Sequence, residues 1–258
     1  MKKFIFATDI HFGYERKGGH KVPLHDIKAV NSMLAFAKDF KPDVFILGGD
    51  VLDCNPVAHH NKGKPGRTEG LKLLVDAQEA VKAVIEPIEA IKPKELIFIT
   101  GNHERFLADM VEEIPGLEGI LDVESLLKLQ KWDIVPQGGH YNLGKLTFVH
   151  GDQLTGGEHI AKAAVIAYER NIRFGHVHTF QSFTKTSPLD YKNAKTGIAV
   201  PCLCHKTPSY GRGKPNRWVQ GFNYGYILDN GNFNDYIVTI LDGQCAVNGK
   251  LYKSGNNV

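Results

Sequence analysis

The sequence predicts an α/β fold in which sheets and helices pack as layers. Residues 1–178 alternate between short apolar runs, typical of buried strands, and longer segments with apolar residues at helical spacing. From about Phe180 the helical spacing stops, and strand-like pieces separated by Gly, Asn and Pro follow. We interpret these pieces as a second β-sheet that completes the same domain. Residues 1–258 are therefore expected to form one domain, with residues 180–253 as its β-rich part.

Short apolar runs predict the strands of this fold. Each run in the first part of the chain stops at a turn rich in Gly or polar residues, as buried strands do. These runs are Phe4–Ala7, Val44–Leu47, Leu96–Ile99, Leu146–Val149 and Ile172–Phe174. In the second part the expected strands are Ile198–Val200, Tyr224–Leu228, Tyr236–Leu241 and Leu251–Tyr252, with a hairpin turn at Asp229–Asn232.

Helical spacing of apolar residues predicts helices between the early strands. The segment Leu71–Ile91 carries the longest such pattern, and Pro87 is expected to kink or end it because proline has no N–H to donate. The other predicted helices are Leu24–Phe40, Val123–Leu129 and His159–Tyr168.

The composition is that of a soluble globular protein. A chain of 258 residues can bury roughly three quarters of its unfolded surface without disulfide bonds. Its hydrophobic content of 42% and charged content of 23% are ordinary. A net charge of +3 and a pI near 8.5 are only mildly basic, so composition alone does not indicate a nucleic-acid partner.

The four cysteines show no disulfide framework, and free thiols suit a reducing cytosol. Cys202 and Cys204 are separated by one residue, unlike the C-x-x-C pairs of zinc sites, so we interpret them as core or loop thiols. The first apolar run ends at Asp9, too early for a signal peptide, and no run approaches the ~18 residues of a membrane span. We expect a cytoplasmic protein without a membrane partner.

Each of the five early strands is followed by side chains that bind metals. Functional groups in open α/β sheets gather beyond the carboxyl ends of the strands, so we expect these side chains to meet at one rim. Asp, Asn and His together suit Mn, Fe, Zn or Ni better than Ca or Mg. The set is too large for one tetrahedral ion and fits two ions that share a bridging carboxylate. The candidate ligands are Asp9, His11, Asp50, Asn102, His150, His176 and His178.

The motifs that hold these residues occur in a known order. The chain resembles the calcineurin-like metallophosphoesterase superfamily in five blocks that cover residues 9–178. Such a resemblance implies a four-layer αββα sandwich of two mixed β-sheets flanked by helices. The blocks are D-x-H at Asp9 and His11, G-D-x-x-D at Gly49–Asp53, G-N-H-E at Gly101–Glu104, His-Gly at His150 and G-H-x-H at Gly175–His178.

The resemblance also implies roles for the site residues. One ion would bind Asp9, His11, Asp50 and His178, and the other would bind Asp50, Asn102, His150 and His176. A hydroxide that bridges the ions would attack the phosphorus of a phosphomono- or phosphodiester. His103 would protonate the leaving group as general acid, and Asp53 would accept a hydrogen bond from its other ring nitrogen. The expected cofactors are two divalent ions, manganese first in vitro, with iron, zinc or nickel as alternatives.

The motifs point to more than one branch of the superfamily. G-N-H-E is the form of protein Ser/Thr phosphatases, but those enzymes have an arginine directly after the second motif, where this chain has Cys54. The Gly-Gly-Asp form and the long loop Cys54–Arg67 resemble the DNA-repair exonucleases, which usually have G-N-H-D and a capping domain. The run from Trp218 to Gly225 is similar to compact phosphoesterases from phage genomes.

For the substrate we expect a nucleotide or a nucleic acid, DNA or RNA, because cationic and aromatic side chains interleave in the loop of residues 205–218. The alternatives are a phosphoprotein or small-molecule phosphomonoesterase and, in another class, a non-catalytic metal-bearing scaffold. An intact His103–Asp53 pair argues against the scaffold. Glu104 either caps the helix that follows it or orients neighbouring groups. Candidate substrate contacts are Arg105, Tyr210, Arg212, Lys214 and Arg217.

Overall fold

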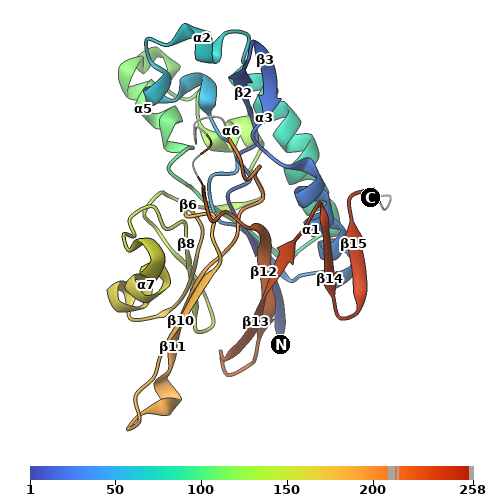
Figure 1. Cartoon of the computed structure of the whole chain (residues 1–258), viewed down its shortest axis with the longest axis vertical. Helices are drawn as coiled ribbons and strands as arrows, with labels where there is room; N and C mark the ends of the chain where they lie inside the picture. The colour runs from blue at the N-terminus through green and yellow to red at the C-terminus, as the bar shows by residue number, and fades with distance from the viewer. Residues whose placement is uncertain (209–212, 214, 256–258) are drawn as a thin grey trace.

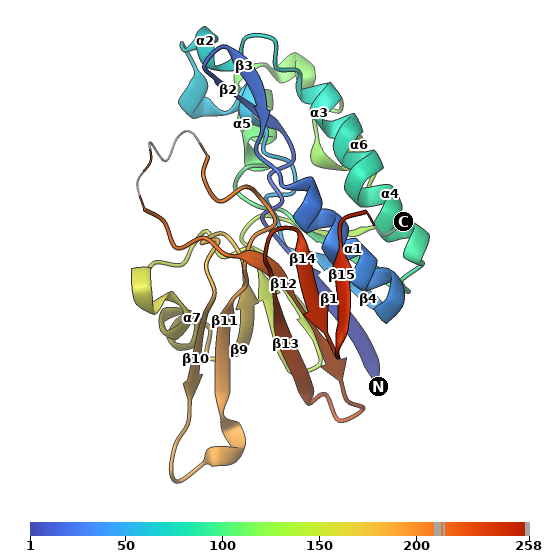
Figure 2. The same cartoon turned by 45° about the vertical axis from the view of Figure 1, so that its right-hand side comes forward.

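Two β-sheets lie face to face and carry helices on their outer faces in the computed structural model, which describes residues 1–208, 213 and 215–255 (Figures 1 and 2). The first sheet has the strand order β13-β12-β1-β4-β5-β6 and the second has the order β10-β11-β9-β8-β7. In the first sheet β1 (Lys2–Ala7), β4 (Val44–Leu47), β5 (Glu95–Ile99) and β6 (Asp133–Val135) are parallel, whereas β12 (Gln220–Ile227) and β13 (Phe233–Ile240) are antiparallel neighbours.

The second sheet is also mixed. Its central strands β8 (Leu146–Val149), β9 (Asn171–Phe174) and β11 (Lys195–Ala199) are parallel, and β7 (Tyr141–Leu143) and β10 (Gln181–Lys185) pair antiparallel at its edges. Two separate hairpins complete the strands, β2 (Tyr14–Lys17) with β3 (His20–Pro23) and β14 (Gln244–Val247) with β15 (Lys250–Lys253).

Helices cover both sheets. The first sheet is covered by α1 (Ile27–Phe40), α3 (Leu73–Ala80), a π-helical turn (Val81–Ile85), α4 (Glu86–Ile91) and α6 (Val123–Leu127), and the second by α7 (Ile160–Tyr168) (Figure 2). The short α2 (Pro65–Thr68) and α5 (Arg105–Glu113) lie with the β2–β3 hairpin at one end of the molecule (Figure 1). Short 3₁₀ turns occupy Asn55–Val57, His59–Asn61, Pro115–Leu117, Gly157–His159 and Tyr191–Asn193.

Strand alternation explains the four layers. In β1, Phe4 and Phe6 enter the cluster between the two sheets, whereas Ile5 and Ala7 face the helices on the other side. Because successive side chains of a strand point to opposite faces, an apolar run of this kind fits a sheet that is covered on both sides. The predicted αββα sandwich is confirmed.

A buried ion pair links the two sheets. Arg173 of β9 is 1% exposed and donates from its guanidinium to both carboxylate oxygens of Asp235 in β13, over 2.6 and 2.8 Å. Asn223 of β12 donates a further hydrogen bond of 3.0 Å to the same carboxylate. Two charges buried between sheets are tolerated because each satisfies the other in a bidentate arrangement.

The strands after Phe180 do not form a second sheet of their own, so that part of the interpretation was wrong. β10 and β11 extend the sheet that β8 and β9 begin, whereas β12 and β13 join the first sheet. β12 pairs antiparallel with β1, with Phe4 opposite Gly225, and so covers an edge of β1 that would otherwise be open. The predicted turn at Asp229–Asn232 does connect β12 to β13.

The structure shows local detail in two of the predicted helices. The helix predicted from Leu24 begins at Ile27, because the Asp26 carboxylate caps it by accepting from the N–H groups of Lys28 and Ala29. The helical run over residues 73–91 does not end at Pro87. A π-helical turn ends at Ile85, with Glu86 between it and Pro87, and it changes the hydrogen-bond pattern near the N–H that proline lacks.

Within the described part of the chain, none of the helices has both the length and the apolar character needed to cross a membrane.

Candidate metal centre

The seven predicted metal ligands come together in the structure. They occupy the turns after β1, β4, β5, β8 and β9, five parallel strands whose carboxyl ends meet at one rim of the two sheets. Two groups of side chains that could hold an ion share one member, Asp50. These groups are Asp9, His11 and Asp50 on one side and Asp50, His150 and His176 on the other.

On the first side, three side chains face one another. His178 Nε2 lies 3.1 Å from Asp9 Oδ1 and 3.1 Å from His11 Nε2. The Nε2 atom of His11 lies 3.7 Å from Asp50 Oδ2. Three potential metal ligands and the shared Asp50 carboxylate therefore surround one small volume, as the four ligands predicted for the first ion require.

On the second side, His150 is the predicted ligand next to the shared carboxylate, whose other oxygen accepts the backbone N–H of His103 over 2.9 Å. The Nε2 atom of His150 lies 3.4 Å from Asp50 Oδ2 and 3.0 Å from Asn102 Oδ1. The ring of His176 is 5.3 Å from that of His150, between centroids, and the backbone N–H of His176 donates to the Asp9 carboxylate over 2.9 Å. Asp50 thus stands between two sets of donors, which is the position a bridging ligand would need.

The backbone of these turns is held in an uncommon conformation. Five of the seven predicted ligands have left-handed φ values, which cost free energy for residues other than glycine. Asp, Asn and His tolerate this region better than most residues, and such strain clusters at functional sites. The five are Asp9 (54°), His11 (50°), Asp50 (50°), His176 (66°) and His178 (58°).

Two motif glycines are explained by close approach. A Cβ atom at Gly101 would overlap the carboxylate and backbone nitrogen of Asp50, and one at Gly175 would overlap Thr8 and the Asp9 carboxylate. Only a residue without a side chain lets the turns of different strands approach so closely.

Glu104 fastens two of the turns together. Its buried carboxylate accepts four backbone hydrogen bonds, from the N–H groups of Asp50, Val51, Leu52 and Gly101, over 2.7–3.0 Å. It makes no capping hydrogen bond to α5, so of the two roles foreseen for Glu104 the structure has the orienting one. Burial and the nearby Asp50 carboxylate raise the pKa of Glu104, while the amide donors act in the opposite direction.

His103 is anchored through one ring nitrogen. Its Nδ1 lies 2.8 Å from the backbone carbonyl oxygen of Asp53 and 3.4 Å from the carboxylate of the same residue. The carbonyl can only accept, so Nδ1 carries a proton and the tautomer is fixed. Burial works to lower the pKa of His103, but the Asp50 and Asp53 carboxylates raise it to about 10.

Asp53 also holds His11. Its Oδ2 lies 2.9 Å from His11 Nδ1, closer than to His103. Burial alone would raise the pKa of Asp53, but the hydrogen bonds from the two histidines keep it below its usual range. The carboxylate predicted to orient the general acid therefore orients a predicted metal ligand as well.

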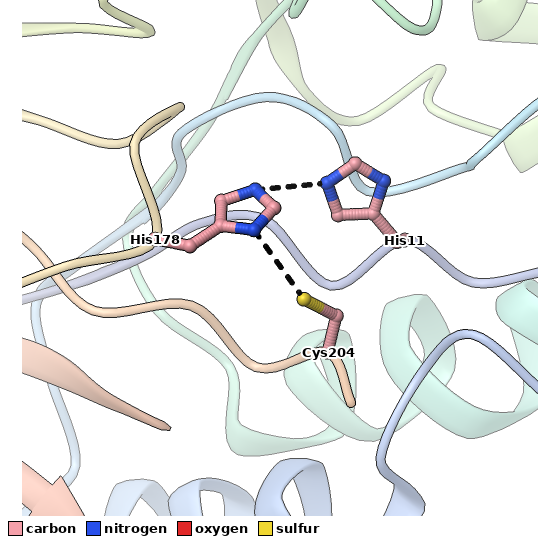
Figure 3. A group of neighbouring side chains, drawn as sticks. All are labelled: His11, His178 and Cys204. Atoms are coloured by element: carbon pink, nitrogen blue, oxygen red, sulfur yellow. Dashed lines mark hydrogen bonds between the residues drawn. The ribbon is translucent and has the colours of Figure 1, made fainter. Parts of the chain in front are cut away.

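Cys204 is a neighbour of the site that sequence reasoning assigned to the core or a loop. Its Sγ lies 3.7 Å from Nδ1 of His178, on the opposite edge of the ring from His11 (Figure 3). The thiol is buried, and burial raises its pKa well above the usual value. The sequence could have indicated this position, because Cys204 follows the strand β11, which lies beside β9 in the second sheet.

These residues fit a pair of divalent ions. Asp9 and Asp50 are almost fully buried within reach of several imidazoles, and a cation would offset their charge. Nδ1 of His176 is buried and has no hydrogen-bond partner in the described residues, as expected for a nitrogen that binds a metal ion. Imidazole, carboxylate and amide donors suit a transition metal.

The candidate substrate contacts are only partly described. Arg105 donates from Nε to Asp109 over 3.2 Å on its own helix, and its side chain is 58% exposed. Arg217 is paired with Glu158. Tyr210, Arg212 and Lys214 lie outside the described residues. The substrate roles assigned to these five stay predictions.

A family model described as calcineurin-like phosphoesterase matches residues 2–228. The chain belongs to this family. The predicted resemblance is confirmed, and membership makes the chain a metal-dependent phosphoester hydrolase whose family normally binds two divalent metals. The match includes all five blocks on which the site was predicted.

This calcineurin-like phosphoesterase is similar to two phage proteins over most of its length. The gene 54 proteins of Mycobacterium phages L5 and D29 are each 23% identical to it, over 248 and 247 residues. Both alignments cover 90% of this chain and 95% of the relative.

Three solved structures are distantly similar. Vps29 of Chaetomium thermophilum has a TM-score of 0.47 and 12% identity, over 98% of this chain and 97% of its own. The nuclease MPE of Pseudomonas putida has a TM-score of 0.40 and 14% identity, over 97% of this chain and 87% of its own. A dimetal phosphatase of Danio rerio has a TM-score of 0.44 and 9% identity, over 92% of this chain and 95% of its own. All three TM-scores are below 0.5, and we base no conclusion on them.

Proposed function

We propose that this calcineurin-like phosphoesterase hydrolyses phosphomono- or phosphodiesters at two divalent ions that share Asp50, with His103 as general acid. The observation that carries the proposal is the position of Asp50, whose Oδ2 lies within 3.7 Å of His11 and 3.4 Å of His150. Asp9, His11 and His178 would complete the shell of one ion, and Asn102, His150 and His176 that of the other.

When bound, the two ions would lower the pKa of a water molecule and neutralise charge on the phosphoryl oxygens. We propose manganese as the first choice in vitro, with iron, zinc or nickel as alternatives, because the donors mix imidazole with carboxylate. The chain contributes rigidity to this chemistry. Glu104 and Asp53 hold the turns and rings in place before a substrate arrives, so little reorganisation is left for the reaction itself.

His103 can deliver a proton at one atom. Because its Nδ1 is engaged by Asp53, Nε2 is the nitrogen that faces a leaving group. Hydrogen bonds to this Nε2 are absent among the described residues, and the side chain is 21% exposed, so a substrate can reach it. A protonated His103 would give the Nε2 proton to the leaving oxygen and would also attract the phosphoryl oxygens.

For the substrate we propose a nucleotide or a nucleic acid. The ring of Phe106 packs between His103 and the basic loop Cys54–Arg67. Its centroid lies 5.2 Å from that of His103 and 5.1 Å from that of His59. Beyond His59 and His60, the loop exposes Lys64 and Arg67. Exposed imidazole rings and cationic side chains next to the proposed acid are residue types that stack on bases and pair with phosphates.

Hydrolysis assays with added Mn²⁺ test the proposal. The panel should compare p-nitrophenyl phosphate, its bis-ester, a phosphopeptide, a nucleotide, and single- and double-stranded DNA. We expect two ions per chain by plasma emission, and the strongest activity on nucleotide or DNA. In Asp50→Asn, metal and activity should both be lost, whereas Asp229→Asn, which changes an exposed carboxylate, should behave as wild type.

The same panel separates the alternatives. A preference for p-nitrophenyl phosphate or the phosphopeptide would favour a phosphomonoesterase. Two bound ions with no cleavage of any substrate would favour the metal-bearing scaffold. Two ions retained by Asp50→Asn would show that Asp50 does not bridge them.

A further inference from the structure

Two histidines of the metal centre share an arrangement in which an oxygen atom accepts a hydrogen bond from Nδ1. His11 Nδ1 lies 2.9 Å from the Asp53 carboxylate, and His150 Nδ1 lies 2.8 Å from the carbonyl oxygen of Gly48. Both contacts leave Nε2 directed at the cluster. An oxygen acceptor behind a metal-binding imidazole fixes its tautomer and makes the ring more basic.

His178 follows the same arrangement with a different acceptor. Its Nε2 faces Asp9 and His11, and its Nδ1 faces the sulfur of Cys204 (Figure 3). To offer a lone pair to an ion, Nε2 must be unprotonated, so the ring proton must sit on Nδ1. In the described structure the atom that receives this proton is Sγ of Cys204.

The thiol is held firmly enough to define an orientation. Cys204 forms a β-bridge with His25, and its carbonyl oxygen accepts a hydrogen bond of 2.8 Å from Gln220. The neighbouring Leu203 donates its N–H to the carbonyl oxygen of Asp9 over 3.0 Å. The segment that carries Cys204 is thus tied to the turn that carries Asp9.

His178 is enclosed on its remaining side. The indole of Trp218 lies 4.1 Å from the imidazole, between centroids, and Val219 donates its N–H to the carbonyl oxygen of His178 over 2.9 Å. With His178 almost fully buried, water has little access to Nδ1.

We propose that Cys204 is a positioning residue for His178, which accepts the Nδ1 proton and directs Nε2 at the ion bound with Asp9 and His11. Sulfur accepts a weaker hydrogen bond than a carboxylate or carbonyl oxygen does. Cys204 therefore sets the direction of the ring while adding less to its basicity than Asp53 adds to that of His11. The inference rests on the proposed two-ion site.

Metal affinity of matched variants tests this role. Calorimetric titration with Mn²⁺ should show one of two sites weakened about 10–100-fold in Cys204→Ala. Cys204→Ser keeps an acceptor and should recover at least part of the loss. Cys245→Ala is the control, because Cys245 is buried to a similar degree and packs in the apolar core from β14.

Two spectra distinguish positioning from other roles. In the one-bond ¹H–¹⁵N spectrum of the Zn²⁺-loaded protein, the slowly exchanging Nδ1 proton of His178 should be present in wild type and Cys204→Ser and absent in Cys204→Ala. With Cd²⁺, wild type and Cys204→Ser should share the same ultraviolet spectrum. A thiolate-to-cadmium band in wild type alone would make Cys204 a ligand and overturn the inference.

Unchanged Mn²⁺ affinity in Cys204→Ala, or equal losses in the Ala and Ser variants, would overturn the inference alone. A wild-type chain that takes up no metal would overturn the proposed two-ion site and the inference with it.

Discussion

Glu104→Gln isolates what one buried carboxylate does for the metal centre. Its Oε2 accepts the N–H groups of Asp50 and Gly101, and its Oε1 accepts those of Val51 and Leu52. A glutamine keeps one oxygen and replaces the other with an NH₂ group, which can only donate. Two of the four backbone N–H groups would therefore face a donor instead of an acceptor. Each buried donor left without an acceptor costs about 1–3 kcal/mol, and the variant should lose about 2–6 kcal/mol of unfolding free energy.

Urea and thermal unfolding of the variant measure this loss. For a chain of this size, about 1 kcal/mol moves Tm by roughly 2–4 °C, so we expect a shift of roughly 5–20 °C. Glu112→Gln is the control, since Glu112 is exposed on the same helix and has no hydrogen bond among the described residues. Metal content should also fall in Glu104→Gln, because Asp50 sits in the turn that the carboxylate holds.

A change in unfolding free energy below about 0.5 kcal/mol, the usual range for surface substitutions, would refute this reasoning. It would mean that the turns keep their amides satisfied without Glu104.

Three other perturbations test the acid, the buried charge and the basic loop. His103→Gln should keep both ions and lose about 10²–10⁴ in kcat on esters with poor leaving groups, with a smaller loss on p-nitrophenyl esters; equal losses would contradict a general acid. Burial raises the pKa of Asp76 to about 6, so the unfolded chain loses this proton first, and stability falls as pH rises from about 4 to about 6. In urea, Asp76→Asn should therefore be more stable than wild type by up to about 3 kcal/mol at pH 8 and by less than about 1 kcal/mol near pH 4. A constant difference across this range would refute the assignment. Replacing Lys64 and Arg67 with Ala should raise KM for single-stranded DNA and flatten its salt dependence while sparing the bis-ester. The same assay applies to Arg212, Lys214 and Arg217, and no effect from either set would remove the support for a nucleic acid.

The gathering of the candidate ligands at one rim could be predicted because its information is local. Each ligand follows an apolar run directly, so the strand-end rule finds Asp9 or His150 without knowledge of how the strands pair. The left-handed backbone at five of the ligands is likewise compatible with the residue types in the motifs.

What holds the ligands could not be predicted, because it depends on contacts between distant segments. Glu104 reaches the amides of a turn more than 50 residues away, and Cys204 meets His178 only because β11 lies beside β9. The pairing of β12 with β1 is non-local in the same way, since it joins the first strand to residues 220–227. That residues 1–258 form one domain, and that the protein is cytoplasmic, stay predictions.

The left-handed backbone at the candidate metal ligands lowers the stability of the fold, while the side chains at these positions are needed for the proposed function. Glycine would relieve the backbone cost at Asp9, His11, Asp50, His176 and His178, a cost of about 1–2 kcal/mol at each such position. It would also remove a side chain that the proposed centre needs. A laboratory selection for heat resistance alone would therefore reward loss of activity, and a stabilised library of this enzyme has to be screened for turnover at every round.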